Sequence, residues 1–196
     1  MAKEKNPAFG ERIITGEGRC SFPHLAEPDN SKFGQGKYHV DLIFEDDSQS
    51  SKLKADCIAH AKAFYKVEDV SEIKFPWKDG NKNAKYTGYE GNEFITAKCK
   101  QQPNVVDRNK KVFDPKKVYG GCNIRLSVTP LAYEMEDEVF VVENGQKRKE
   151  TLKIQGISLV LNAVQFVGDN ERFGGGGDGF DDSYCDADTE ADDGGF

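Results

Sequence analysis

Cations interleaved with aromatic rings through the middle of the chain are the residues with the clearest chemical potential. Aromatic rings can stack on unpaired bases, and cations can follow a phosphate backbone without reading its sequence. We interpret these side chains as a candidate surface for single-stranded nucleic acid; the alternative is a solvated lysine-rich surface whose aromatic rings belong to the core. The members of the cluster are Lys74, Trp77, Lys78, Lys82, Lys85, Tyr86, Tyr89, Lys98, Lys100, Arg108, Lys110, Lys111, Tyr119 and Arg125.

The formal net charge of −7 conceals the basic character of this region. Residues 174–196 hold eight acids and no Lys or Arg, so residues 1–173 carry 26 acids against 27 bases. Within residues 62–125 there are 14 Lys and Arg residues and only 8 acids. The chain therefore combines a mildly basic body with a strongly acidic tail.

The acidic tail reads GGGGDGFDDSYCDADTEADDGGF and occupies residues 174–196. It has too little apolar surface to offset the entropy of ordering, so we expect a folded domain over residues 1–173 followed by a disordered tail. The tail suits two tasks, which are docking on a partner through Asp192, Asp193 and Phe196, and occupying the basic groove of its own protein. The alternative is a solubilising tail without a specific target.

Signals for catalysis are weak. The chain lacks GxxxxGK[ST], HExxH and GxSxG, and its glycines at 34 and 36 make no phosphate loop. The acids at 46–47 and 136–138 could hold a divalent metal, as in a nuclease, but such runs are more often solvated turns. We expect no catalytic residue, no cofactor and no metal site.

Cysteine usage indicates a reducing compartment. The five cysteines form no CxxC pair, and none of the three histidines lies at metal-ligand spacing from a cysteine. No apolar run is long enough for a signal peptide or a membrane span, so the sequence predicts a soluble intracellular protein without membrane association.

Alternation of apolar and polar residues predicts a mainly β fold with one helix. Strands are expected over residues 11–22, 37–45, 93–101, 105–112, 121–131 and 152–167, and the three- and four-residue spacing of apolar positions predicts a helix over 48–66. Residues 67–92 are expected to form a long irregular basic loop. About five core strands and one helix suit a small barrel such as the OB-fold, with a β-sandwich as the competing architecture.

Local signals refine these elements. Serines 48, 50 and 51 are candidate helix N-caps, and the prolines at 23 and 28 predict a loop after the first strand. In residues 121–131 we expect Ile124, Leu126 and Val128 to face inward. Cys57 and Cys99 are expected in the core. Residues 134–148 are highly charged and suggest only a short element at 139–142 before a turn at Asn144–Gly145.

Several segments together resemble the single-stranded DNA-binding proteins of tailed bacteriophages. They are KYHVDLIFE, EFITAKCK, NVVDRNKKVFDP, KKVYGGCNIRLSVTPLAYEM and LKIQGISLVLNAVQFV, and their order covers residues 10–167. The most specific pieces are VVDRNKK and YGGCNIRLSVTPLAY.

The resemblance implies an OB-fold, single-strand binding without sequence preference, and action in phage DNA replication and recombination in the cytoplasm of the infected bacterial host. It also implies that the tail contacts replication proteins such as DNA polymerase and helicase/primase. Cellular single-strand binders carry a similar acidic tail that ends in Pro-Phe, whereas Gly195 precedes Phe196 here.

Rival functions remain open at this point. They are an RNA-binding chaperone, a metal-dependent nuclease and a virion structural protein with a basic surface. The sequence does not identify which aromatic ring of residues 75–89 stacks on bases, and it leaves association into a homodimer open.

Overall fold

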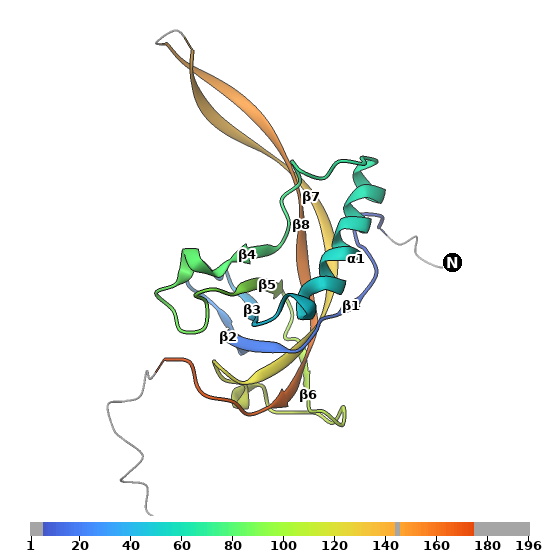
Figure 1. Cartoon of the computed structure of the whole chain (residues 1–196), viewed down its shortest axis with the longest axis vertical. Helices are drawn as coiled ribbons and strands as arrows, with labels where there is room; N and C mark the ends of the chain where they lie inside the picture. Colours follow the sequence, from blue (N-terminus) through green and yellow to red (C-terminus); the bar gives the residue numbers. More distant parts are fainter. Residues whose placement is uncertain (1–5, 144–145, 175–196) are drawn as a thin grey trace, which may run out of the picture.

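The protein is mainly β with one α-helix, and a computed structural model describes residues 6–143 and 146–174 (Figure 1). The expected tail, with Asp192, Asp193 and Phe196, lies outside the described residues. The elements are β1 (Ile13–Ile14), β2 (Gly18–Asp29), β3 (Lys37–Phe44), α1 (Asp47–Tyr65), β4 (Trp77–Asp79), β5 (Glu93–Cys99), β6 (Asn104–Val106), β7 (Asn123–Glu143) and β8 (Gln146–Gly168), with short 3-10 helices at Gly80–Asn83 and Pro115–Lys117.

All eight strands belong to one sheet. Strand β7 pairs with β2, β2 with β3 and β3 with β5, each antiparallel. Strand β5 then pairs with β8 in parallel, and β8 pairs with β7. These five strands therefore form a closed cycle of neighbours, to which β1, β4 and β6 are added at the margins.

The core lies inside this cycle and under the helix. Leu42, Ile95 and Leu126 are fully buried, as are Cys57 and Ala61 on the inner face of α1. The inward set predicted for the start of β7 is confirmed, because its three members are buried while the alternating residues remain half-exposed. Cys99, which was expected in the core, is only half-buried.

The helix begins one residue earlier than expected, and its cap differs. The Asp46 carboxylate accepts a hydrogen bond from the Ser48 backbone N–H at 2.7 Å, and the Gln49 side chain accepts one from the Asp46 N–H at 3.2 Å. This reciprocal arrangement is a capping box. The prediction that a serine caps the helix was therefore wrong, because Asp46 occupies the position from which a side chain reaches the free N–H groups of the first turn. The hydrogen bonds from Ser48 also lower the pKa of Asp46.

Strand β2 continues through the region expected to be a loop. It runs to Asp29 across both prolines, with register shifts on each side of His24 that absorb them. Gly18 lets β2 approach β3 closely, since a Cβ at this position would lie 2.4 Å from the Ile43 carbonyl oxygen. The expected irregular stretch 67–92 is confirmed apart from β4 and one 3-10 turn.

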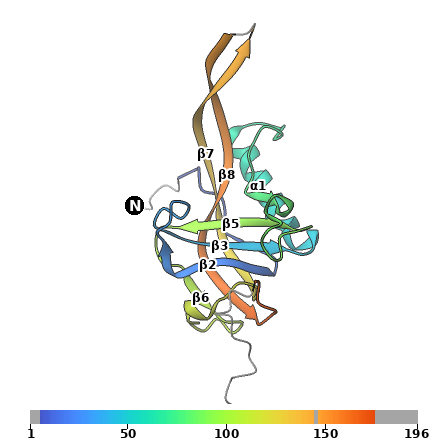
Figure 2. The same cartoon turned by 90° about the vertical axis from the view of Figure 1, so that its left-hand side faces the viewer.

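The largest departure is the hairpin of β7 and β8, whose far half projects from the body (Figures 1 and 2). The two strands pair from Asn123 and Gly168 to Glu143 and Gln146, with two register shifts before Val128. In the register of the two strands Glu136 lies opposite Lys153, and Lys153 also forms an ion pair with Glu134 at 3.1 Å. The charged segment expected to hold a short element is therefore a long paired ribbon.

Tyr65 fixes the hairpin where it leaves the body. Its hydroxyl lies 2.7 Å from the Tyr133 carbonyl oxygen and 2.9 Å from that of Gly156, and accepts from the Gly156 N–H at 3.1 Å. Gly156 lets the Tyr133 ring lie across the strand, because an added Cβ would meet that ring at 2.4–2.8 Å. The C-terminal end of α1 thereby holds both strands of the ribbon.

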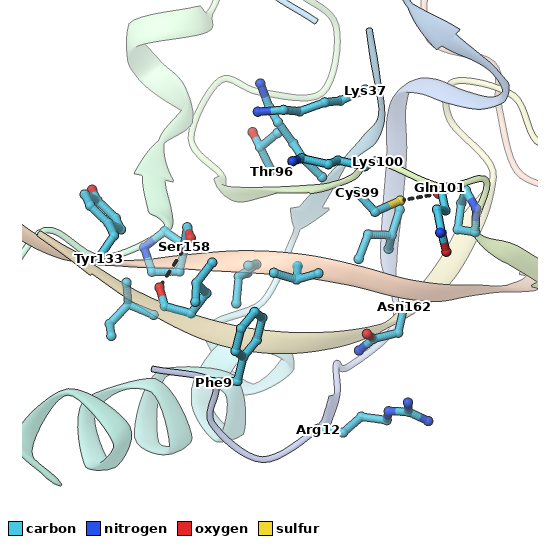
Figure 3. Close-up of a pocket in the computed structure, with 18 of the residues that line it drawn as sticks. Phe9, Arg12, Lys37, Thr96, Cys99, Lys100, Gln101, Tyr133, Ser158 and Asn162 are labelled. Atoms are coloured by element: carbon cyan, nitrogen blue, oxygen red, sulfur yellow. Dashed lines mark hydrogen bonds between the residues drawn. The ribbon is translucent and has the colours of Figure 1, made fainter. Parts of the chain in front are cut away.

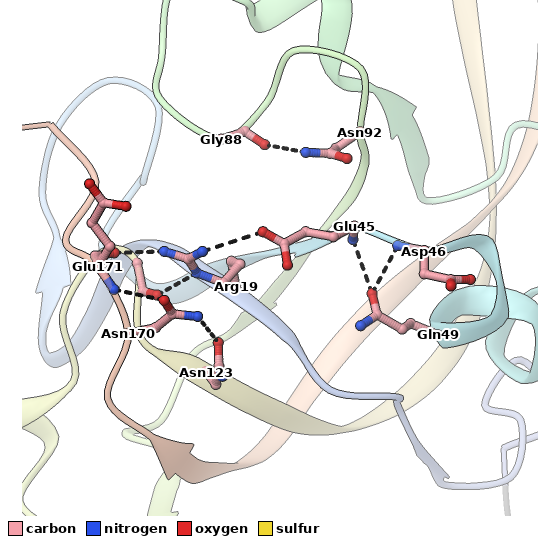
Figure 4. A network of polar contacts seen from close by, with 10 residues as sticks. Arg19, Glu45, Asp46, Gln49, Gly88, Asn92, Asn123, Asn170 and Glu171 are labelled. Atoms are coloured by element: carbon pink, nitrogen blue, oxygen red, sulfur yellow. Dashed lines mark hydrogen bonds and ion pairs between the residues drawn. The ribbon is translucent and has the colours of Figure 1, made fainter.

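Arg19 holds the end of the described chain against β2 (Figure 4). Its guanidinium donates to the carbonyl oxygens of Gly121 and Glu171 at 2.6 Å each, pairs with Glu45 at 3.3 Å, and lies 4.6 Å from the centre of the Phe173 ring. The segment that leads to the acidic tail therefore starts from a fixed point. In the part of the chain that is described, no helix combines the length and apolar character needed to cross a membrane.

Candidate nucleic-acid interface

A groove of about 1030 Å³ lies between β5 with its flanking segments and the β7–β8 ribbon (Figure 3). It contains no Asp or Glu among its lining residues, all of which are in the described part. Three aromatic rings, from Phe9, Phe75 and Tyr133, contribute to its walls. Its charged lining consists of five cations: Arg12, Lys37, Lys78, Lys98 and Lys100.

Strand alternation places the groove cations. Ile95 and Ala97 of β5 point into the core, so Thr96 and Lys98 face outward. Lys78 on the neighbouring β4 donates from Nζ to the Thr96 Oγ1 at 3.2 Å, and its ammonium also lies 5.4 Å from the centre of the Phe94 ring. These contacts hold Lys78 in the same groove lining as Lys98 and Lys100, and such a gathering of positive charge attracts a phosphate backbone.

Phe75 and Trp77 form a parallel stacked pair next to this row. Their ring centres lie 4.4 Å apart with an 8° angle between the planes. Both residues are half-buried and pack on the core, but Phe75 lines the groove and Trp77 does not. The ring that the structure offers to the groove is therefore Phe75, with Trp77 as its support.

Of the predicted residues, Lys78, Lys98 and Lys100 lie in the groove. Lys74 and Trp77 flank Phe75 in the chain, and the Lys74 backbone bonds to β8 through the Gln155 carbonyl at 2.9 Å. These five predicted residues are the part of the cluster that the fold gathers at the groove or beside it.

A second group lies around the 3-10 helix at Gly80–Asn83. Tyr86 meets Phe22 edge to face at 5.1 Å, and the Lys85 ammonium lies 4.7 Å above the Tyr86 ring, with Lys82 in the same segment. Tyr89 does not face solvent: it is 1% exposed, and its hydroxyl donates to Asp41 at 2.7 Å. Burial raises the pKa of Tyr89 well above its ordinary value. The assignment of Tyr89 to base stacking is corrected, because its ring is a core residue.

The remaining predicted cations belong to another side of the fold. The turn predicted after β6 is confirmed, with Asp107 accepting from the backbone N–H groups of Asn109 and Lys111. Lys110 and Arg125 line a smaller hollow of about 190 Å³, and Arg125 donates to the Thr15 carbonyl at 3.1 Å. Arg108 belongs to the turn after β6, as do Lys110 and Lys111. The lining of the large groove includes none of these three cations and does not include Arg125.

Tyr119 is engaged by the segment that follows β8. Its hydroxyl donates to Asp169 at 2.9 Å, and the Arg172 guanidinium lies 4.2 Å from the centre of its ring. Desolvation of the Tyr119 hydroxyl makes the largest contribution to the raised pKa of this residue. This ring therefore anchors residues 169–172 and stands apart from the groove.

Five groove residues with a charged or aromatic side chain were outside the predicted cluster: Phe9, Arg12, Lys37, Phe75 and Tyr133. Phe9 and Arg12 precede the first strand, and only pairing of this segment with β7, as in the Phe9–Leu131 bridge, brings them to the groove. Tyr133 lies at the end of the YGGCNIRLSVTPLAY motif, which is the one signal that could have located it.

A comparison with known protein families shows the family to which this chain belongs. The model described as "Enterobacter phage Enc34, ssDNA-binding protein" matches residues 11–194. The chain belongs to this family. A curated relative, the putative protein p50 of Acyrthosiphon pisum secondary endosymbiont phage 1, is 29% identical over 180 residues, covering 81% of this chain and 84% of that protein.

Solved structures of phage proteins share the fold of this family member. The single-stranded DNA-binding protein from bacteriophage Enc34 in complex with ssDNA has a TM-score of 0.57 at 22% identity, with 83% of this chain and 89% of that chain covered. The same bacteriophage protein in another structure gives 0.57 at 23% identity, over 84% and 85%. The single-stranded DNA-binding protein gp2.5 of bacteriophage T7 gives 0.56 at 18% identity, over 91% and 99%.

The acids considered for a nuclease do not converge in this family member. Asp46 caps α1, and Glu136 lies on the projecting ribbon opposite Lys153. The groove lining includes neither of them. The described acids of these two runs therefore have structural surroundings that do not form a shared metal site.

Proposed function

We propose that the protein binds single-stranded DNA without sequence preference and carries out no catalysis. The observation that carries the proposal is the groove in which five cations and three aromatic rings are gathered without a carboxylate. Membership of the phage ssDNA-binding family supports it, as does the likeness to a fold that has been solved with ssDNA.

Each part of the groove has a physical role in this proposal. Lys78, Lys98 and Lys100 neutralise successive phosphates, which gives affinity without base recognition. Phe75 and Tyr133 offer ring faces on which unpaired bases stack, at roughly 1–3 kcal/mol per base. A duplex keeps its bases inside the helix and cannot use these rings, so the groove favours single strands.

We further propose that the closed cycle of β2, β3, β5, β8 and β7 is an OB-fold barrel and that residues 1–173 are the DNA-binding domain. The parallel contact between β5 and β8 in an otherwise antiparallel cycle supports this assignment. Such barrels bind oligonucleotides across one face of their strands. The groove beside the outer face of β5 fits that mode.

Titration of the full chain with oligo-dT, duplex DNA of equal length and matching RNA, each at two salt concentrations, tests the proposal. The logarithm of the binding constant should fall with the logarithm of salt by about 0.7 per phosphate contacted, with roughly four to seven contacts for a site of this kind. Equal affinity for duplex and single strands would rule out stacking, and clear preference for RNA would favour the RNA-chaperone alternative.

In the cell this activity suits phage replication and recombination in the host cytoplasm. A protein that binds only unpaired strands shifts hairpins toward the open form by mass action and needs no ATP. Recruitment of DNA polymerase and helicase/primase through the acidic tail, and association into a homodimer, remain predictions.

The tail is proposed to compete with DNA. Twenty-two residues beyond Gly174, if unstructured as their composition predicts, have a root-mean-square reach of roughly 25 Å, and tethering raises their effective concentration toward millimolar. Deleting residues 174–196 should therefore increase single-strand affinity several-fold at low salt and have little effect at high salt, where charge attraction is screened. Fluorescence titration at both salt concentrations measures this change.

Deleting Phe196 alone is the matched control for the tail. It leaves the eight acids in place, so DNA affinity should stay near that of the full chain while partner docking weakens. Unchanged affinity after removal of the whole tail at low salt would restrict the tail to partner binding.

A further inference from the structure

We infer that His24, Asp29 and His39 form a zinc site at the turn that joins β2 to β3. One ligand atom from each residue lies within 4.8 Å of the other two. The spacing of these residues in the chain corresponds to no metal-binding motif, and the expectation of no metal site considered only the spacing of histidines relative to cysteines. Strand pairing is what brings the three side chains together.

The antiparallel register of β2 and β3 builds the cluster. His24 and His39 are direct partners, with ring centres 4.6 Å apart at an angle of 34°. Asp29 ends β2, and register shifts in this strand let its carboxylate reach back to His39, where Oδ2 lies 3.1 Å from Nε2. The carboxylate is held in place by the Ser31 backbone N–H at 2.8 Å.

The ligand set fits zinc. Imidazole nitrogen and carboxylate oxygen bind Zn²⁺ at roughly 2.0–2.2 Å, so two ligands of one tetrahedral ion lie roughly 3.4 Å apart. The Asp29 and His39 atoms, at 3.1 Å, already meet this separation, and the ligand atoms, which all lie within 4.8 Å of one another, would have to close by up to roughly 1.4 Å. Three protein ligands leave a fourth position for water, which is the open form of a four-coordinate zinc site.

The state of these side chains also suits a cation. Asp29 and His39 side chains are each 13% exposed, so the site is partly shielded but open to solvent. Nδ1 of His39 is buried and has no hydrogen-bond partner among the described residues.

The site connects the β2–β3 turn to the groove. Gly36 donates its backbone N–H to the Asp29 carbonyl at 2.8 Å, and Gly34 packs so closely on Asp29 that an added Cβ would lie 2.2 Å from its carboxyl carbon. Lys98, which lines the groove, is the β5 register partner of His39 and directs its ammonium to the Phe33 carbonyl at 3.5 Å. A bound ion would fix this turn beside the groove. Any effect of the ion on DNA affinity rests on the proposed function, whereas metal binding itself does not.

Titration of the metal-free full chain with Zn²⁺ and Co²⁺, without DNA, tests the inference. We expect one equivalent of metal, a rise in melting temperature with Zn²⁺, and Co²⁺ visible bands without the charge-transfer band of thiolate ligands. His24→Asn and His39→Asn should each lower metal affinity by at least the roughly 10–100-fold that loss of a supporting group causes. His60→Asn is the control, because the third histidine lies on α1 and bonds to the Ala8 carbonyl.

Three results would overturn the site. They are absence of metal binding, unchanged affinity in both variants, and a thiolate band showing that cysteines hold the metal. Thermal melting of each metal-free variant checks folding, and Asp29→Asn, which keeps the size of the side chain, provides an independent ligand variant. A chain that binds zinc at this site but not single strands would retain this inference and lose the proposed function.

Discussion

Replacing Lys78, Lys98 and Lys100 together with glutamine should lower single-strand affinity about 50-fold near 0.15 M salt. Each lysine is expected to neutralise one phosphate, and each lost contact removes about 0.7 from the slope of log affinity against log salt. The slope should therefore become shallower by about 2. All three side chains are exposed in the groove, so the substitutions should leave folding intact. Titration with oligo-dT at several salt concentrations measures both quantities.

A matched triple variant separates the groove from the overall charge. Lys52, Lys116 and Lys117 are also exposed and are not among the groove residues. Replacing them with glutamine changes the net charge by the same amount, and we expect only a small loss of affinity. If the two triple variants bind equally weakly, the basic character of the whole body would account for binding and the groove would lose its special role.

Phe75→Leu should weaken single-strand binding by about 1–3 kcal/mol, the range for loss of one base-stacking contact. Leucine keeps an apolar side chain against the core but removes the ring face that Phe75 presents to the groove. Affinity for oligo-dT is the measurement. The fluorescence of Trp77, which stacks on Phe75, should respond to DNA in the natural chain and respond less in the variant.

A second stacked pair supplies the control for this experiment. Phe113 and Phe166 stack at 4.5 Å with an angle of 7°, a geometry close to that of Phe75 and Trp77, but neither lines the groove. Phe113→Leu should cost a comparable amount of stability without loss of DNA affinity. Equal losses of affinity in both variants would attribute the effect to the fold and contradict stacking at Phe75.

Sequence patterns located the elements that have one face in the core. Strands β3 and β5 and the first half of β7 alternate because one side of each is buried, as Leu42, Ile95 and Leu126 are. The same logic could not find the projecting half of the β7–β8 ribbon, where Met135 and Leu152 are both 51% exposed. Where the side chains of this half are described, at residues 134–137 and 151–153, both faces are exposed, so no alternation marks the strands.

The sequence predicted only part of the candidate groove, because local patterns do not show which distant residues the fold brings together. Lys78, Lys98 and Lys100 fall within a basic stretch of sequence, whereas Phe9 and Tyr133 reach the groove only through long-range pairing. Tyr89 shared the lysine-rich surroundings of its neighbours, yet its ring completes a small core cluster with Ile43 and Phe94. Composition identified a basic, aromatic surface, but the fold determines which of these side chains are exposed and which of them lie together.

The closed cycle of strands has a consequence for the order of events during folding. Its parallel contact joins Lys98 to Val160, and its contact between β2 and β7 joins Gly18 to Ile124. Pairings between such distant segments form late and make folding slow. Until β8 arrives, β5 lacks its β8 neighbour and exposes an edge on which another chain could pair. Nascent chains at high synthesis rates should therefore depend on chaperones until the last strand of the body is complete.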